Sequence, residues 1–368
     1  MKIRLLHLLF LAAAMPAFAA EPTPLAWPVE KQDVTWDSPS TDAKGSMPLG
    51  NGDIGINAWV EPSGDLLLLV GKSDSFDEFN RLLKLGRIRI QTTPALFQPG
   101  QSSTQTLRLE DGSIAISTPT AKLRLWVDAN HPVVQVDCTA AQPIEAKVIL
   151  ENWRKENRAL GQEGPNPSVA SSAAGNWPDK LRVNADTILP AKPGQLAWCH
   201  HNVESQWKKN LEHQALGDEV AKGKDPILDR SFGALIRSGD FKASSATELA
   251  TPKAVAAFSV QIVPLTTFVP SPEAWLAQAE KTAEAVPADT RARFAAHTTW
   301  WHDFWNRSWI QLTNDTTRPV ATTTYPGKLC LGVNTQGGNA FSGMISDPVS
   351  FPRALTGDEI AQAAKSPR

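Results

Sequence analysis

The stretch GKSDSFDEF concentrates charged side chains that could do chemistry. General acid and base catalysis at a glycosidic bond needs two carboxyl groups about 5 to 10 Å apart, so Asp74 and Asp77 are candidate catalytic residues. The same stretch also fits a structural role. It matches a capping box in which Ser75 and Glu78 start a short helix around residues 79–83.

A second polar cluster, WCHHNVESQW, holds further candidates for ligand contacts: His200, His201, Asn202, Glu204 and Trp207. Imidazole, amide and carboxylate groups hydrogen-bond sugar hydroxyls, and an aromatic ring stacks on the apolar face of a sugar. The cluster therefore predicts a sugar-contacting loop, with Glu204 as a third catalytic candidate. A structural, hydrogen-bonded loop is the alternative.

Metal binding is a further possibility for this cluster. If the segment is a strand, His200 and Asn202 face one side and His201 the other, so the adjacent histidines cannot easily bind one ion. A metal site would need another ligand nearby, from His213, Asp225 or Asp229. We therefore expect neither a metal ion nor another cofactor.

The stretch MPLGNGDIGINAW spells the G-x-G-x-x-G of a dinucleotide-binding turn with Gly50, Gly52 and Gly55. That turn needs a strand before the first glycine and a helix after the third. Here Pro48 precedes the motif and an alternating, strand-like run follows it. The glycines are therefore expected to form a turn before a strand, with Asn51 and Asp53 as its polar groups.

Short runs of alternating apolar and polar residues indicate the strands that must position these clusters. The runs are 54–60, 66–70, 87–91, 113–117, 122–128, 133–138, 144–150, 232–236, 246–249 and 256–263. So many strands predict a mainly β fold, an antiparallel sandwich over residues 27–268. Between residues 153 and 229 the alternation fades, which predicts a long irregular insertion whose tryptophans favour an ordered structure.

Helical signals follow the sandwich. SPEAWLAQAEKTAEA has Ser271 as N-cap and Pro272 at the first helical position, so we expect linker helices over residues 271–312. The second helix carries tryptophans at a spacing of four: Trp301, Trp305 and Trp309. This spacing is typical of a stripe that packs against the rest of the fold, whereas Trp300 points elsewhere.

Several longer strings resemble known families. GSMPLGNGDIGINAWVEPSGDLLLLVGKSDSFDEF is similar to the start of the N-terminal domain of family 95 glycoside hydrolases. LPAKPGQLAWCHHNVESQW, DPILDRSFGALI and HTTWWHDFWNRSWIQL resemble more closely the bacterial domain of unknown function 5703. The resemblance covers residues 27–312 and implies a β-supersandwich, followed by linker helices that normally lead into an (α/α) toroid.

The resemblance implies a role with sugars but transfers no catalytic residue. In family 95 enzymes the catalytic carboxylates lie in the toroid, and the similarity stops where the toroid would begin. The resemblance also places the loop after residue 71 at the rim of a sugar cleft. The sugar contacts expected overall are Asn51, Asp53, Lys72, Asp74, His200, His201, Asn202 and Trp207. Residues 322–366 resemble the last strands of a laminin-G or concanavalin-like jelly roll, which predicts a partial module.

Residues 1–20 are typical of an export signal, with Lys2 and Arg4, an apolar run and small residues at the end. We therefore expect an exported protein of the periplasm or the extracellular space. No later segment is apolar enough to span a membrane. The net charge is -2 and the basic residues are scattered, so a nucleic-acid partner is not expected. The cysteines, Cys138, Cys199 and Cys330, could be free buried thiols or include one disulfide.

Together these features predict an exported, carbohydrate-associated protein that binds a glycan or oligosaccharide and lacks the catalytic toroid. Two alternatives stay open. One is an active glycosidase that uses Asp74, Asp77 and Glu204. The other is a truncated, non-catalytic structural or interaction protein. The residues indicate no particular oligomeric state.

Overall fold

The computed structural model describes residues 29–98, 100–159, 182–190 and 192–307. The chain divides into two compact units, Met1–Trp309 and Ile310–Arg368, and the described residues all belong to the first. The signal segment 1–20, the tail 322–366, Trp309 and Cys330 lie outside the described residues. Within the described part, no helix is long and apolar enough to cross a membrane.

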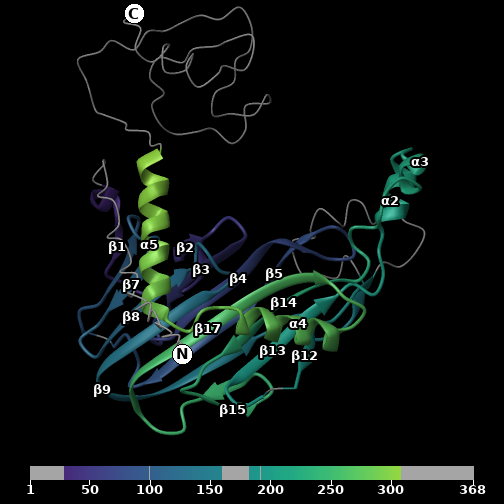
Figure 1. Ribbon diagram of the computed structural model, residues 1–368. Coiled ribbons are helices and arrows are strands. Elements are labelled where there is room, and N and C mark those ends of the chain that lie inside the picture. Colours follow the sequence, from purple (N-terminus) through teal and green to yellow (C-terminus); the bar gives the residue numbers. More distant parts are fainter. Residues whose placement is uncertain (1–28, 99, 160–181, 191, 308–368) are drawn as a thin grey trace, which may run out of the picture. The chain divides into compact units, whose positions relative to one another are not determined.

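Two antiparallel sheets form a β-sandwich, which confirms the expected fold class (Figure 1). The first sheet comprises β1 (Val34–Trp36), β6 (Thr104–Arg108), β7 (Ser113–Ser117), β8 (Ala121–Val127), β17 (Val255–Phe268), β14 (Arg230–Arg237), β13 (Gln195–His201) and β12 (Thr187–Leu189). The second comprises β2 (Met47–Gly50), β3 (Ile54–Val60), β4 (Leu66–Phe76), β5 (Leu82–Thr93), β16 (Glu248–Ala250) and β15 (Lys242–Ser245). A long strand, β9 (Val134–Glu151), belongs to both sheets.

The strand β9 joins the two layers. Its first half pairs with β8 and β17, and its second half pairs with β5 and β16. The strand order is β1-β6-β7-β8-β9-β17-β14-β13-β12 in one layer, while β2, β3, β4, β5 and β9 are successive neighbours in the other. The sequence analysis predicted β9 as two separate runs, 133–138 and 144–150, because polar residues interrupt the alternation where the strand passes from one sheet to the other.

The expected irregular insertion contains regular structure among its described residues. It holds β12, β13, a small ladder of β10 (Arg158–Ala159) with β11 (Arg182–Val183), and two short helices, α2 (Trp207–His213) and α3 (Gly217–Val220). The strand β13 lacked an alternating pattern because both of its faces are buried. Its Trp198 belongs to the core between the sheets, and its Cys199 packs on the other face against a helix.

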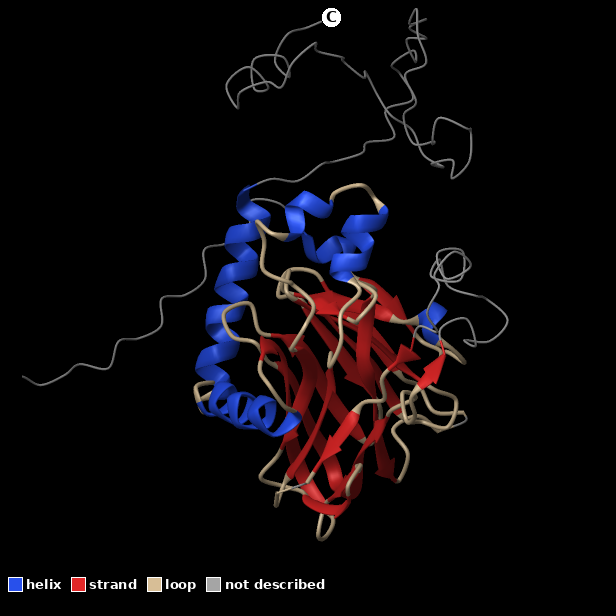
Figure 2. Cartoon of the chain, turned by 90° about the vertical axis from the view of Figure 1, so that its right-hand side faces the viewer, coloured by secondary structure: helices blue, strands red, loops and turns tan. Residues whose placement is uncertain are grey.

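That helix is α4 (Pro272–Glu284), which begins where the sequence predicted. Ser271 caps it by accepting a hydrogen bond from the backbone N–H of Ala274 at 3.3 Å, and Pro272 occupies the first turn. Trp275 is fully buried against the outer face of the first sheet. Figure 2 shows α4 and the following helix on one side of the strands.

The second helix, α5 (Thr290–Arg307), is attached to the sandwich by polar groups as well as by its aromatic stripe. Arg293 forms an ion pair with Asp128 at 2.9 Å, and the indole N–H of Trp305 donates to the backbone oxygen of Leu109 at 2.7 Å. Trp301 packs directly over Gly112. The predicted stripe therefore packs on the sandwich through Trp301 and Trp305.

Two 3-10 helices precede β2 and complete the described elements, η1 (Val29–Gln32) and η2 (Ala43–Gly45). The main core lies between the sheets, where inward-facing residues of both layers form one cluster. Ile54, Ile56 and Ala58 of β3 belong to it, so the alternate residues of β3 face away from the core.

Candidate functional site

A row of three glycines crosses the outward face of the second sheet. Gly50 of β2 pairs with Gly55 of β3, and Gly55 pairs with Gly71 of β4. Gly71 in turn lies opposite Lys84 of β5. Paired residues point to the same side of a sheet. Because Ile54 beside Gly55 is buried in the core, the glycine row faces outward.

Above this row lies a hollow of about 440 Å³. The missing side chains leave bare backbone as its floor, and the polar residues of its lining are Asp53, Lys72, Ser73 and Lys84. Small-molecule sites have volumes of about 300–1,000 Å³, so the hollow is large enough for a small ligand. It is therefore a candidate binding site within the described residues.

The fold requires glycine at two positions of the G-x-G-x-x-G motif but not at the third. A side chain at Gly50 would place its Cβ 3.0 Å from the backbone oxygen of Ile54, and Gly52 has a φ of +91° in the turn. At Gly55 a Cβ would meet only the backbone oxygen of Leu49, at 3.9 Å. Glycine weakens a strand interior, and it often marks a place where a ligand approaches the backbone closely.

The rim of the hollow is a small charged cluster. The Nζ of Lys72 lies 2.8 Å from Asp53 Oδ1 and 2.9 Å from Asp74 Oδ1. Ser73 Oγ donates to the same Asp53 oxygen at 2.9 Å. Burial alone would raise the pKa of Asp74, but its hydrogen bond with Lys72 and the charge of that ammonium lower it overall. Asp74 is therefore ionised at neutral pH.

Asn51 holds the turn that carries Asp53. Its side-chain oxygen accepts hydrogen bonds from the backbone N–H groups of Asp53 and Ile54, at 3.1 and 2.8 Å. Its amide nitrogen donates to the backbone oxygen of Asp128 at 2.8 Å. These bonds position the turn at the edge of the hollow and engage both ends of the Asn51 side chain.

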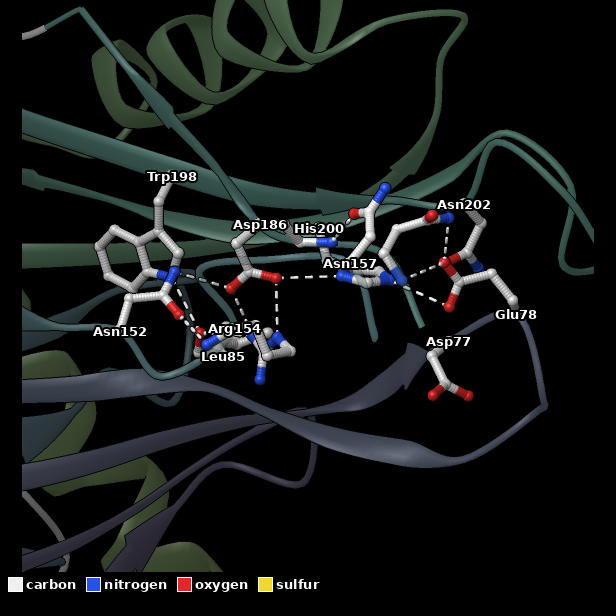
Figure 3. A network of polar contacts seen from close by, with 12 residues as sticks. Asp77, Glu78, Leu85, Asn152, Arg154, Asn157, Asp186, Trp198, His200 and Asn202 are labelled. Atoms are coloured by element: carbon white, nitrogen blue, oxygen red, sulfur yellow. Dashed lines mark hydrogen bonds and ion pairs between the residues drawn. The ribbon is translucent and has the colours of Figure 1, made fainter. Parts of the chain in front are cut away.

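A second polar group is buried inside the sandwich (Figure 3). The Nδ1 of His200 lies 3.0 Å from Asp186 Oδ1, and its Nε2 lies 3.2 Å from Glu78 Oε2. Arg154 closes the far end with an ion pair to Asp186 at 2.7 Å. None of the His200 surface is exposed. Positive and negative side chains therefore alternate along the chain of contacts Glu78, His200, Asp186, Arg154.

The carboxylates keep this histidine charged. Burial by itself lowers the pKa of His200, but the hydrogen bonds with Asp186 and Glu78 outweigh burial and raise it to about 9. For Asp186, burial acts to raise the pKa, and its contacts with His200 and Arg154 lower it overall. Two cations thus balance two carboxylates in the interior, which is the condition under which buried charges are tolerated.

The network ties together segments that are far apart in the sequence. Arg154 donates to the backbone oxygens of Lys84 and Leu85 at 2.8 and 3.0 Å, and the indole N–H of Trp198 donates to Leu85 at 2.9 Å. The start of β5, which carries Lys84, is therefore fixed from inside. The network supports one wall of the hollow.

The predicted capping box and helix at residues 79–83 are wrong. Asp77 stabilises a turn instead, accepting hydrogen bonds from the backbone N–H groups of Phe79 and Arg81 at 3.1 and 2.8 Å. Ser75 donates to the backbone oxygens of Lys72 and Leu83. No helix is capped here because the Glu78 side chain points into the interior and contacts His200.

A family model described as domain of unknown function DUF5703 matches residues 35–310. The match covers well over half of the chain. The chain belongs to this family. The resemblance expected from the sequence is thereby confirmed for the N-terminal region.

Curated proteins gave no match to this DUF5703 chain. Among solved structures, one similar chain is described as a kojibiose phosphorylase from the human microbiome, with a TM-score of 0.35 and 7% identity. The alignment covers 74% of this chain and 34% of the other, so this chain spans about a third of the phosphorylase.

The structure places the sequence-predicted residues of the DUF5703 domain in three different surroundings. Asp53 and Lys72 line the hollow, Asp74 forms an ion pair with Lys72, and Asn51 holds the turn that carries Asp53. His200 and Asn202 are fully buried, with Asn202 donating to the backbone oxygens of Phe76 and Ile227.

The remaining predicted residues lie outside the lining of the hollow. Asp77 is buried in its turn, in an ion pair with Arg81. His201 is half-buried and contacts Ser231 Oγ at 2.7 Å. Glu204 is exposed, and Trp207 begins α2 half-buried. Within the described residues, no group of three or more possible ligands is placed to hold a metal ion.

Four residues of this DUF5703 site escaped the sequence analysis. Gly71 and Lys84 line the hollow, and Arg154 and Asp186 complete the buried network. Gly71 and Lys84 become neighbours of Gly55 only through strand register, for which a single sequence holds no signal. Arg154 and Asp186 were hidden in the insertion because its strands are very short. Arg154 and Asp186 lie 32 positions apart and outside the strands, so no local pattern marks them as partners.

Proposed function

We propose that this protein is exported and binds carbohydrate in the hollow above Gly55 and Gly71. The observation that carries the proposal is Gly55, because the fold leaves room for a side chain at this strand position and yet the residue is glycine. Because Gly55 has no side chain, the floor of the hollow is open, and a sugar ring could rest there against the backbone. The family resemblance to glycoside hydrolase domains supports a sugar as the ligand.

The chemistry of the rim suits hydroxyl groups. The Asp53 carboxylate is 48% exposed in its side chain and accepts hydrogen bonds, and Ser73 can both donate and accept. Lys72 holds Asp53 in place, so these groups are oriented before a ligand arrives. Such preorganisation lowers the entropic cost of binding.

The proposal is tested by refilling the floor. Gly55→Ala adds a methyl group where a ligand would lie, and Gly55→Val adds more. We expect several-fold weaker glycan binding for the first variant and at least tenfold for the second. Stability should stay the same or rise by up to about 1 kcal/mol, because Gly is unfavourable in a strand. Glycan arrays followed by calorimetry measure binding, and urea unfolding measures stability.

Gly239→Ala is the matched control, since Gly239 lies in an exposed turn with no atom near its missing Cβ. It should bind like the wild type. If the Gly55 variants also bind like the wild type, the hollow is not the site. If folded wild-type protein binds no glycan across plant, algal and mucin arrays, the proposal of glycan binding is wrong.

Hydrolysis is a second candidate function, favoured by one observation. Two carboxylates, Asp53 and Asp74, meet on the ammonium of Lys72 at the rim. The lowered pKa of Asp74 suits a base or nucleophile. Release of nitrophenol from a panel of aryl glycosides, lost in Asp74→Asn, would support this activity. If the protein hydrolyses none of the aryl glycosides in the panel, hydrolytic activity on these substrates is excluded.

A further inference from the structure

Lys84 carries a positive charge into the hollow without an ionic partner among the described residues. Its Nζ lies 3.3 Å from Asn57 Oδ1, which is the only side-chain hydrogen bond of Lys84 in that part of the chain. A Cβ on Gly71 would lie 3.4 Å from this nitrogen, so the ammonium group is held over the glycine floor.

The other lysine of the lining is in the opposite state. Lys72 is only 9% exposed in its side chain and contacts two carboxylates, Asp53 and Asp74. Its charge is neutralised by groups of the protein itself. Lys84 is exposed, and Asn57, a neutral amide, orients its ammonium without neutralising it.

A lone ammonium at a fixed place in a hollow is suited to an anionic group. Charge-assisted hydrogen bonds, such as those from an ammonium group to a carboxylate, are shorter and about twice as strong as hydrogen bonds between neutral groups. A neutral sugar would offer Lys84 only hydroxyl groups, which water replaces at little cost. A carboxylate or sulfate on the ring would supply the missing countercharge.

Resting on the proposed function, we infer that the hollow selects acidic sugars, with the anionic substituent bound by Lys84. The ring would lie over Gly55 and Gly71, where no side chain obstructs it. Its hydroxyl groups would face Asp53 and Ser73 at the rim. Carboxylated and sulfated sugars share this chemistry, and the experiment distinguishes them.

The experiment compares pairs of oligosaccharides in which one member carries anionic groups and the other carries their neutral counterparts. The full chain is titrated calorimetrically with oligogalacturonate, with its methyl ester, and with a sulfated galactan oligosaccharide beside its desulfated form. We expect binding of the acidic member of at least one pair, and at least tenfold weaker binding of its neutral partner. Binding should weaken as salt rises, because salt screens exposed charges.

Variants then assign the selectivity to Lys84. Lys84→Gln should weaken binding of the acidic ligand about tenfold, which corresponds to about 1.4 kcal/mol, and should leave the neutral partner unaffected. Lys84→Arg should retain most of the affinity. Lys122→Gln, at an exposed position on β8, is the control for loss of one surface charge.

The outcomes separate this inference from the proposed function. Equal binding of acidic and neutral partners, or no effect of Lys84→Gln, overturns acidic selectivity while glycan binding stands. If folded protein binds none of the four ligands and no acidic glycan on an array, the inference is overturned. Binding of neutral glycans on that array would leave the proposed function intact.

Discussion

At the scale of single residues, the buried His200 has a charge that should govern how stability depends on pH. Its pKa in the folded chain, about 9, lies above the ordinary value of 6.5. Its stabilising effect is therefore complete below pH 6.5 and is lost as the pH rises through 9. The lowered pKa of Asp186 acts at the acid end, where stability is lost as that carboxylate becomes protonated.

We predict that the free energy of unfolding of the wild type falls between pH 6.5 and pH 9, by an amount on the order of 3 kcal/mol. His200→Asn should remove most of that slope. It should also destabilise the protein by about 3–5 kcal/mol at neutral pH, because two buried carboxylates lose their cation. Urea unfolding at a series of pH values measures both effects.

The neighbouring His201 provides the comparison. It lies on the opposite face of β13, half-buried, and burial lowers its pKa. His201→Asn should therefore keep the alkaline slope of the wild type. A slope that survives in His200→Asn, or disappears in His201→Asn, would show that other groups set the pH dependence.

At the scale of elements, α5 docks on the sandwich through a glycine. Gly112, in the turn before β7, has a φ of +56°, and a Cβ there would lie 2.1 Å from Nε1 of Trp301. The indole ring thus occupies the space that any other residue would need. Trp301 of the tryptophan stripe therefore packs where Gly112 leaves space for its ring.

We predict that Gly112→Ala loosens α5. The change combines backbone strain of about 1–2 kcal/mol with displacement of Trp301. We expect a total loss of stability of about 2–5 kcal/mol, since overpacking adds about 1–3 kcal/mol to the strain. Urea unfolding measures the total, and hydrogen exchange in residues 290–307 shows whether the helix itself is affected.

Gly100→Ala isolates the backbone contribution, because Gly100 has a φ of +80° and open space around its missing Cβ. It should cost only the strain of about 1–2 kcal/mol and leave exchange in α5 unchanged. Equal losses in both variants would mean that the contact between Gly112 and Trp301 contributes nothing to docking.

At the scale of the whole molecule, the two cysteines of the described residues are protected inside the fold. Cys138 and Cys199 are buried and free. Burial raises the pKa of Cys138 to about 12 and raises that of Cys199 as well. Thiolate is the reactive form, so neither thiol is activated for oxidation while the protein is folded.

Export itself is tested by the mature N-terminus. We predict that a bacterial host removes the signal segment, so that the mature chain begins near Ala20 or Glu21 and is recovered outside the cytoplasm. Fractionation and intact mass measure location and cleavage. A Leu9→Arg change in the apolar run should block export, whereas Lys31→Gln, beyond the segment, should not. Full-length wild-type chain in the cytoplasm would contradict the proposal.

The sequence by itself determined the features that depend on near neighbours in the chain. Alternating residues predicted most strands of the sandwich, Ser271 and Pro272 marked the start of α4, and Trp301 and Trp305 lay on the packed face of α5. The motif around Gly50 was assigned to a turn before a strand, which is correct for Gly52, whereas Gly50 ends β2 and Gly55 lies in β3. The expectation that Pro48 excludes a strand before the motif was wrong, because Pro48 lies within β2. Periodicity and capping are local, so one sequence is enough to reveal them.

Only the tertiary structure decided which distant residues meet. Glu78 looked like a capping residue, yet it is buried against His200, which lies 122 positions away in the chain. Gly55, Gly71 and Lys84 became one surface through the register of three strands. Register depends on how separate segments pair and bury their apolar faces, and the sequence of one segment does not contain its partner's position.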